Sequence, residues 1–92
     1  MIDAADSATA DDVKLAAIIG FVADAADCEI ATVSPDSDIY NELGVDSLGA
    51  MAIFIDMAFE FSAPEPPEQF DFAAVNTPRK LLDYVNAAHA RA

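Results

Sequence analysis

The chain has 92 residues, of which 17 are acidic and 4 are Lys or Arg, so its formal net charge at pH 7 is −13. This length predicts one domain with a modest core, too small for a deep cleft between two lobes. The charge argues against nucleic acid and anionic lipid surfaces as partners, and it favours basic protein surfaces. We therefore expect no nucleic acid partner and no stable membrane insertion.

The sequence contains few residues suited to redox or nucleophilic chemistry. Cys28 is its one cysteine, which excludes an intramolecular disulfide, and we interpret it as a buried or half-buried thiol. A catalytic thiol would need a histidine partner, and His89 is the one histidine. No run reaches the roughly 20 apolar residues of a membrane span, and the acidic N-terminus is unlike a signal peptide. The expected location is the cytoplasm.

The first predicted element is an amphipathic helix. Residues 1–10 are small, polar and acidic, and we expect them to form a flexible N-terminal segment. Behind them, the run DDVKLAAIIGFVADAAD has apolar residues at helical spacing and an acidic first turn, which suits the positive end of a helix. We predict a helix from Asp11 to about Asp27, within one domain of residues 11–92.

A long ordered loop is predicted next, in the run CEIATVSPDSDIYNELGV. Pro35 prevents a helix from continuing through it, and Gly44 is expected to close a turn at its end. Several apolar side chains should fix this loop to the core: Ile30, Val33, Ile39, Tyr40 and Leu43.

Two further long helices and a short one complete the predicted fold. The second helix should begin at Asp46 or Ser47, since both are good N-cap residues, and end near Phe61. The prolines that follow forbid a long helix but allow a short one over Pro67–Phe70. Thr77 and Pro78 form a start signal for the last helix. The predicted fold class is all-α: a small four-helix bundle of three main helices and one short helix.

The second predicted helix has two apolar faces. At about 100° per residue, one face gathers Ala50, Ile53, Phe54, Met57 and Phe61, and the opposite face gathers Leu48, Met51, Ala52, Ile55 and Phe59. One face can pack into the core of a helical bundle. The other is either covered by loops or free to bind a partner. We favour a docking surface, because exposed apolar patches usually mark interaction sites.

Ser47 stands at the start of this helix, and a hydrolase nucleophile is the first interpretation to test. A nucleophile elbow needs Gly-x-Ser-x-Gly, and the run GVDSLG is one residue out of register. His89 is the only candidate base. The sequence therefore argues against a hydrolase nucleophile.

Calcium binding is a second interpretation of the acidic run before Ser47. Asp36 and Asp38 resemble the front of an EF-hand loop, but Tyr40 occupies the next ligand position and Ser47 the place of the bidentate glutamate. No EF-hand or dedicated metal site is predicted. Diffuse binding of cations remains an alternative for the acidic residues of this run: Asp36, Asp38, Glu42 and Asp46.

Covalent modification is the third interpretation. A serine at a helix N-terminus places its hydroxyl where free backbone N–H groups and the positive end of the dipole favour a phosphate ester. The plain alternative is that Ser47 only caps the helix.

The run LGVDSL resembles the signature around the attachment serine of acyl carrier proteins. Three further runs are similar to the same family: VSPDSDIYNELGVDSL before the serine, IDMAFEFSAPEP at the end of the second helix, and VNTPRKLLDYV at the entry to the last helix. The resemblance extends from roughly Asp11 to Ala88.

This resemblance implies a four-helix carrier without catalytic activity of its own. Ser47 would receive 4′-phosphopantetheine from coenzyme A through a separate, magnesium-dependent phosphopantetheinyl transferase, and the thiol would hold acyl groups as thioesters. Asp46 would help to position the metal and the coenzyme in the transferase complex. Leu48, Met51 and Ile55 match positions where the family meets partner enzymes, and Phe59 shares their face.

The implied role is to deliver acyl intermediates to acyl-transferring or acyl-activating enzymes, in fatty acid or polyketide-type biosynthesis. We expect the protein to be a monomer. We also expect a bound acyl chain to fold back between the second helix and residues 70–75. Small or adaptable side chains would line its cavity: Ala50, Phe54, Met57, Phe72, Ala73 and Ala74. The equal alternative is that these residues form an ordinary core.

The second helix departs from the carriers of fatty acid synthesis in its charge. Those proteins carry several glutamates on this helix. The matching sites of this chain look like Ala52, Ala58 and Phe59, and the acidic residues that remain on the helix are Asp56 and Glu60. This departure suggests a specialised carrier with more apolar partners. Two alternatives stay open: a peptidyl or aminoacyl carrier with the same serine chemistry, although the double glycine common there is missing, and an unmodified helical adaptor.

Overall fold

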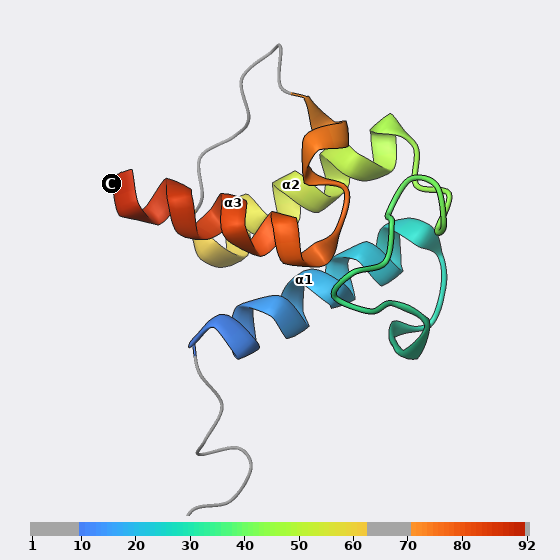
Figure 1. Cartoon of the computed structure of the whole chain (residues 1–92), viewed down its shortest axis with the longest axis horizontal. Coiled ribbons are helices and arrows are strands. Elements are labelled where there is room, and N and C mark those ends of the chain that lie inside the picture. The colour runs from blue at the N-terminus through green and yellow to red at the C-terminus, as the bar shows by residue number, and fades with distance from the viewer. Residues whose placement is uncertain (1–9, 63–70, 92) are drawn as a thin grey trace, which may run out of the picture.

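The computed structural model describes residues 10–62 and 71–91, and all that follows refers to these (Figure 1). The elements in chain order are α1 (Ala10–Ala26), the 3-10 turn η1 (Ile30–Thr32), α2 (Ser47–Phe61), the 3-10 turn η2 (Phe72–Val75) and α3 (Pro78–Arg91). The predicted all-α class is confirmed, as are the three main helices and the long loop. The short helix expected over Pro67–Phe70 lies outside the described residues, as does most of the N-terminal segment expected to be flexible.

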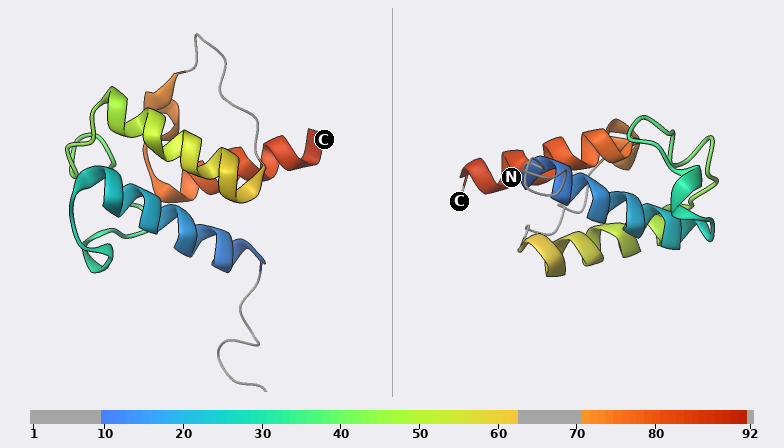
Figure 2. Two further views of the ribbon diagram at one scale, coloured as in Figure 1. Left: turned by 180° about the vertical axis from the view of Figure 1, so that it is seen from behind. Right: turned by 90° about the horizontal axis from the view of Figure 1, so that it is seen from below.

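The three long helices are arranged around α1. Figures 1 and 2 show α1 running in the opposite direction to both α2 and α3, while α2 and α3 run roughly the same way. The α1 backbone packs along both of the other helices. The N-terminus of α2, the loop before it and η1 gather at one end of the molecule, and α3 ends at the other (Figure 2).

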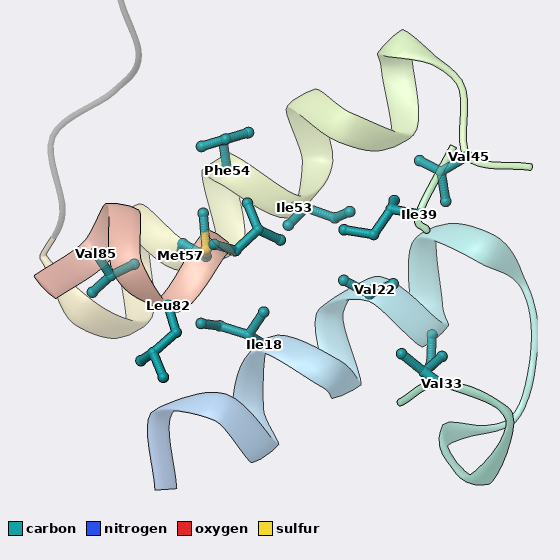
Figure 3. Packing of buried hydrophobic residues seen from close by; sticks show 12 residues of the cluster. Ile18, Val22, Val33, Ile39, Val45, Ile53, Phe54, Met57, Leu82 and Val85 are labelled. Atoms are coloured by element: carbon teal, nitrogen blue, oxygen red, sulfur yellow. The ribbon is translucent and has the colours of Figure 1, made fainter. Parts of the chain in front are cut away.

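The core lies where α1 faces α2 and α3 (Figure 3). Phe54 joins the separate parts of this core, because its ring packs edge-on against Tyr84 of α3 and against Phe72 of η2, each with ring centroids 5.3 Å apart. Such tilted ring pairs are the arrangement that aromatic quadrupoles favour. The other buried apolar side chains include Ile18, Val22, Val33, Ile39, Val45, Ile53, Met57, Leu81, Leu82 and Val85.

The loop between α1 and α2 is fixed to the core by its apolar side chains, largely as predicted. Val33 and Ile39 are buried, and Tyr40 and Leu43 pack against the core half-buried. The prediction was wrong for Ile30, which is 62% exposed. Ile30 begins η1, where its carbonyl accepts a hydrogen bond from the Val33 amide at 3.0 Å. Val33, in extended backbone just after this turn, enters the core in its place.

The carboxylate of Asp38 is the polar centre of the loop. One oxygen accepts hydrogen bonds from the amides of Tyr40 and Asn41, and the other from the side-chain amides of Asn41 and Asn76, at 3.0–3.3 Å. The Ile39 amide also donates to the Asn76 carbonyl at 2.8 Å. The hydrogen bonds from Asn41, that of its backbone amide first, hold the pKa of Asp38 below its ordinary value.

A second contact ties the same loop to the start of α3. The Arg79 guanidinium pairs with Asp36 at 2.9 Å, and the Arg79 amide donates to the Pro35 carbonyl at 3.0 Å. The hydrogen bond and charge of Arg79 lower the pKa of Asp36. Both partners are exposed, so this pair contributes less than a buried one would. At the same junction Thr77 caps α3, as predicted, since its hydroxyl oxygen accepts from the Lys80 amide at 3.1 Å.

We predict that Asp38→Asn lowers the melting temperature near neutral pH and has little effect in acid. The folded pKa of Asp38 lies below that of an unfolded aspartate, about 3.9. The ionised carboxylate therefore contributes stability above that pH, and this contribution is lost as the pH falls through the folded pKa. Thermal melts of both proteins from pH 7 to about pH 2 should converge at the acid end.

Asp24→Asn is the matched control, because Asp24 is an exposed carboxylate on α1 whose side chain makes no hydrogen bond in the described structure. It measures the effect of removing one negative charge from this acidic chain. A difference between Asp38→Asn and the unaltered protein that stays constant with pH would contradict the role assigned to the Asp38 carboxylate.

Candidate functional site

The start of α2 is built by a tight turn and a helix cap. Gly44 has a φ of +73°, which allows the chain to turn sharply after the loop. Val45 is buried next to it, and its amide donates to the Ile39 carbonyl at 3.1 Å. Asp46 then adopts extended backbone and caps the helix, because its Oδ1 accepts a hydrogen bond from the Gly49 amide at 2.9 Å.

This geometry decides between the two N-cap candidates left open by the sequence. Asp46 is the cap and Ser47 is the first residue within α2. The plain alternative, in which Ser47 serves as the cap, is therefore wrong. The Ser47 side chain is exposed, at the end of α2 where the helix dipole is positive. An exposed hydroxyl beside free helix N–H groups can carry a phosphate ester.

Gly49 lies in the first turn of α2, and no local sequence pattern singles it out. A Cβ at this position would lie 2.7 Å from a methyl carbon of Val45 and 3.7 Å from the Cβ of Ala25. A larger residue here would require the buried Val45 side chain to shift. A glycine inside a helix is less stable than alanine by about 1 kcal/mol, so its place here reflects packing at the site.

The other serines among the described residues occupy less suitable positions. Ser37 is buried, and its hydroxyl oxygen accepts from the Ser34 amide at 2.9 Å. The Ser34 hydroxyl lies 3.1 Å from that of Ser37 and also accepts from the Asp36 amide. Ser62 follows the last turn of α2, at the negative end of the helix dipole. Ser47 is thus the described serine that combines exposure with a helix N-terminus.

The second apolar face of α2 lies outside the core. The exposed fractions of its side chains are 79% for Leu48, 44% for Met51, 50% for Ile55 and 87% for Phe59. On the opposite face Ala50, Ile53, Phe54 and Met57 are buried. The helical wheel therefore assigned the two faces correctly, although Phe61 on the core side is only partly buried.

The residues expected to line an acyl cavity divide into two groups. Ala50, Phe54 and Met57 are buried, and Phe72 packs against Phe54. Ala73 and Ala74 are exposed. The depression that the structure describes lies elsewhere, between α1 and the C-terminal half of α2. The proposed acyl site is thus occupied by packed side chains, and an acyl chain would have to displace them.

Two chemical candidates remain, His89 and Cys28. His89 belongs to the last part of α3, a helix whose C-terminal end lies across the molecule from the start of α2 (Figure 1). Cys28 is a half-buried free thiol, as expected. Within residues 10–62 and 71–91, no group of three or more His, Cys, Asp or Glu side chains is arranged to hold a metal ion. Over the same residues, no helix has both the length and the apolar character needed to cross a bilayer.

Comparison with known proteins identifies the family of the chain. A family model described as phosphopantetheine attachment site matches residues 16–85, which include the loop, α2 and most of α3. The D-alanyl carrier protein of Bacillus licheniformis is 28% identical over 69 residues, covering 75% of this chain and 88% of the relative. The match of the family model spans well over half of the chain. The chain therefore belongs to the family of carrier proteins with a phosphopantetheine attachment site, whose cofactor is covalently attached 4′-phosphopantetheine.

Proposed function

We propose that Ser47 carries the 4′-phosphopantetheine and that the chain holds acyl intermediates as thioesters on its thiol. The observation that supports this most directly is the exposed Ser47 hydroxyl in the first turn of α2. The cap is supplied by Asp46, so a modified Ser47 would leave the helix capped. The phosphate would lie at the positive end of the helix dipole.

We propose that Asp46 has a second role, in addition to capping α2, in the complex with the transferase. Its Oδ1 accepts from Gly49, while Oδ2 makes no hydrogen bond among the described residues. A free carboxylate oxygen one residue before the reacting hydroxyl is a suitable ligand for the magnesium ion of a transferase. In the reaction the Ser47 oxygen would form the new bond to phosphorus, its proton would pass to a base of the transferase, and the adenosine bisphosphate part of coenzyme A would leave.

We predict that Ser47→Ala abolishes modification without unfolding the domain. Intact mass spectrometry after incubation with coenzyme A, magnesium and a broad-specificity transferase should show the gain of one phosphopantetheine for the unaltered chain and none for Ser47→Ala. Because Ser47 is not the cap, its loss should cost less than the roughly 1 kcal/mol of a lost N-cap.

Two controls separate chemistry from structure in this experiment. Ser62→Ala removes the serine at the other end of α2 and should be modified normally. Asp46→Asn keeps a good capping residue, so it should keep the melting temperature while slowing modification. Persistent modification of Ser47→Ala would refute the proposed attachment site.

The cargo is proposed to be an acyl group of fatty acid or polyketide type. The buried Phe54 ring packs against the half-buried Phe72. Met57 is buried on the same face of α2, and Met adapts to irregular spaces. A second candidate, an aminoacyl cargo, is favoured by the D-alanyl carrier protein among the relatives. Both use the same serine and the same thiol, so the cargo must be distinguished by its contacts with the core.

We predict that a medium-length or long acyl chain enters this part of the core and that an alanyl group does not. The two loaded forms can be made by using the corresponding coenzyme A thioesters in the transferase reaction. Methyl and aromatic NMR shifts of Ala50, Phe54, Met57 and Phe72 should change with the acyl chain, and the melting temperature should rise. Unchanged shifts at these residues would show that the chain remains in solvent and would favour the aminoacyl candidate.

The exposed apolar face of α2 is proposed to be the docking surface for the transferase and for acyl-handling enzymes. Leu48 is next to Ser47, and Met51 and Ile55 continue the same face. An enzyme that reaches the Ser47 hydroxyl is therefore well placed to cover them. A few large side chains usually dominate the binding energy of such interfaces.

We predict that Met51→Glu raises the KM of the transferase by roughly tenfold, the effect of losing a contact worth about 1.4 kcal/mol. Its free energy of unfolding should change by less than about 1 kcal/mol, because Met51 is exposed. Ala16→Glu adds the same charge on an exposed part of α1 and should leave KM unchanged. Equal effects of the two variants would point to net charge as the cause, and unfolding of Met51→Glu would place this face in the core.

A further inference from the structure

Asn76 is the residue at which η2, α3 and the loop before α2 meet. It follows η2 directly and stands two residues before the start of α3. Its carbonyl accepts a hydrogen bond from the Ile39 amide at 2.8 Å, and its side-chain N–H donates to the Asp38 carboxylate at 3.3 Å. Its side-chain oxygen accepts from the Lys80 ammonium at 3.1 Å. This half-buried asparagine thus joins two neighbouring residues of the loop to the start of α3.

The loop extends this attachment to the residue before the cap of α2. The Ile39 side chain is buried, and the Ile39 carbonyl accepts from the Val45 amide at 3.1 Å. Val45 is also buried, and a Cβ on Gly49 would lie 2.7 Å from one of its methyl carbons. Two successive hydrogen bonds, from Asn76 to Ile39 and from Ile39 to Val45, therefore connect the end of η2 with the first turn of α2.

We propose that Asn76 is a positioning residue for the transfer of phosphopantetheine to Ser47. This inference rests on the proposed attachment at Ser47. Transfer requires the attacking hydroxyl to lie in line with the reacting phosphorus, and a small displacement of a reacting group can lower a rate severely. The loop sets the course of the backbone into Ser47, and Asn76 holds the loop. Without this hold the hydroxyl would spend less time in the reactive position.

The expected signature is a fall in the kcat of the transferase with little change in its KM. The face of α2 opposite the proposed docking surface is buried in the core through Ile53, Phe54 and Met57. The docking surface should therefore keep its position when the loop loosens. Binding of the transferase would be unchanged, while the bound serine would be correctly placed for a smaller fraction of the time.

A second asparagine with the same chemistry supplies the matched control. The half-buried Asn86 of α3 donates to the Asp11 carboxylate at 3.1 Å and accepts from the Lys14 ammonium at 3.1 Å. Asn76 bridges a carboxylate and an ammonium in the same way. The two hydrogen bonds of Asn86 join α3 to α1, and neither reaches the loop.

The test compares Asn76→Asp with Asn86→Asp as substrates of the transferase, by the rate of the mass gain with coenzyme A. Each change keeps the size of the side chain and places a carboxylate against the neighbouring aspartate. Asn76→Asp should lower kcat by about two- to tenfold, the effect of losing one ordinary hydrogen bond, with KM nearly unchanged. Asn86→Asp should leave both constants unchanged. Melting temperatures of both variants are measured, and the assays are run well below them.

A double variant separates positioning from stability. Asp38→Asn combined with Asn76→Asp exchanges donor and acceptor, so the side chain at position 38 can donate to the carboxylate at position 76. It should recover part of the kcat that Asn76→Asp loses. Hydrogen exchange of the Val45 amide should be faster in Asn76→Asp than in Asn86→Asp, and slower again in the double variant.

Equal kcat values for the two single variants, an effect confined to KM, or no recovery in the double variant would each overturn the proposal. If Asn76→Asp does not fold, Asn76→Ala removes the same hydrogen bonds without adding a charge, and Asn86→Ala becomes its control. Normal modification of every variant at Ser47 would remove this inference and leave the proposed carrier function intact. Modification of Ser47→Ala would instead refute the attachment site itself.

Discussion

The position of Ser47 depends on a chain of hydrogen bonds that begins at the Asp38 carboxylate. Asp38 binds the Asn76 side chain, the Asn76 carbonyl accepts from Ile39, and the Ile39 carbonyl accepts from Val45 just before the cap. A loop of this length would lose much conformational entropy on ordering, and buried apolar side chains alone do not fix its direction. The polar contacts supply that direction, and Arg79 with Asp36 adds a second tie to the same start of α3. The N-terminal end of α2 is therefore held in part by Asn76 and Arg79, which are far from it in the sequence.

The basic side chains that the structure describes contact other parts of the chain than α2. The described basic side chains all lie on α1 or at the start of α3: Lys14 binds Asn86, Arg79 binds Asp36 and Lys80 binds Asn76. None of them lies on α2. These contacts hold the loop and the first and last helices together. An exposed apolar face flanked by unneutralised carboxylates is then left on α2, where burial by a partner would remove Leu48 and Phe59 from water.

Hydrophobic periodicity predicted most of the fold, because each helix of a small bundle must bury a continuous apolar stripe. It predicted both faces of α2, and local capping chemistry predicted the start of α3 at Thr77 and Pro78. The local sequence could not decide whether Asp46 or Ser47 is the N-cap of α2. Both are good capping residues, and the outcome depends on the geometry of the turn before them. Ile30 was misplaced because the 3-10 turn that it begins was not predicted, and Val33 after this turn is the residue that is buried. The contacts of Asp38 with Asn76 and of Gly49 with Val45 are tertiary, and no local pattern indicates them.

The arrangement at the start of α2 separates two tasks that a single serine would otherwise combine. A serine that both capped the helix and carried a phosphate ester would lose its capping hydrogen bond when modified, or would resist modification in order to keep it. Here the Asp46 carboxylate accepts a hydrogen bond from the Gly49 amide, and the Asp46 carbonyl accepts one from the Ala50 amide. The helix is therefore capped before any group is attached to Ser47. The absence of a side chain on Gly49 lets Val45 pack beneath this turn and hold the cap in place. Under the proposed function, Ser47 can therefore be modified with little change in the stability of the domain, and the same fold can present both forms to its partners.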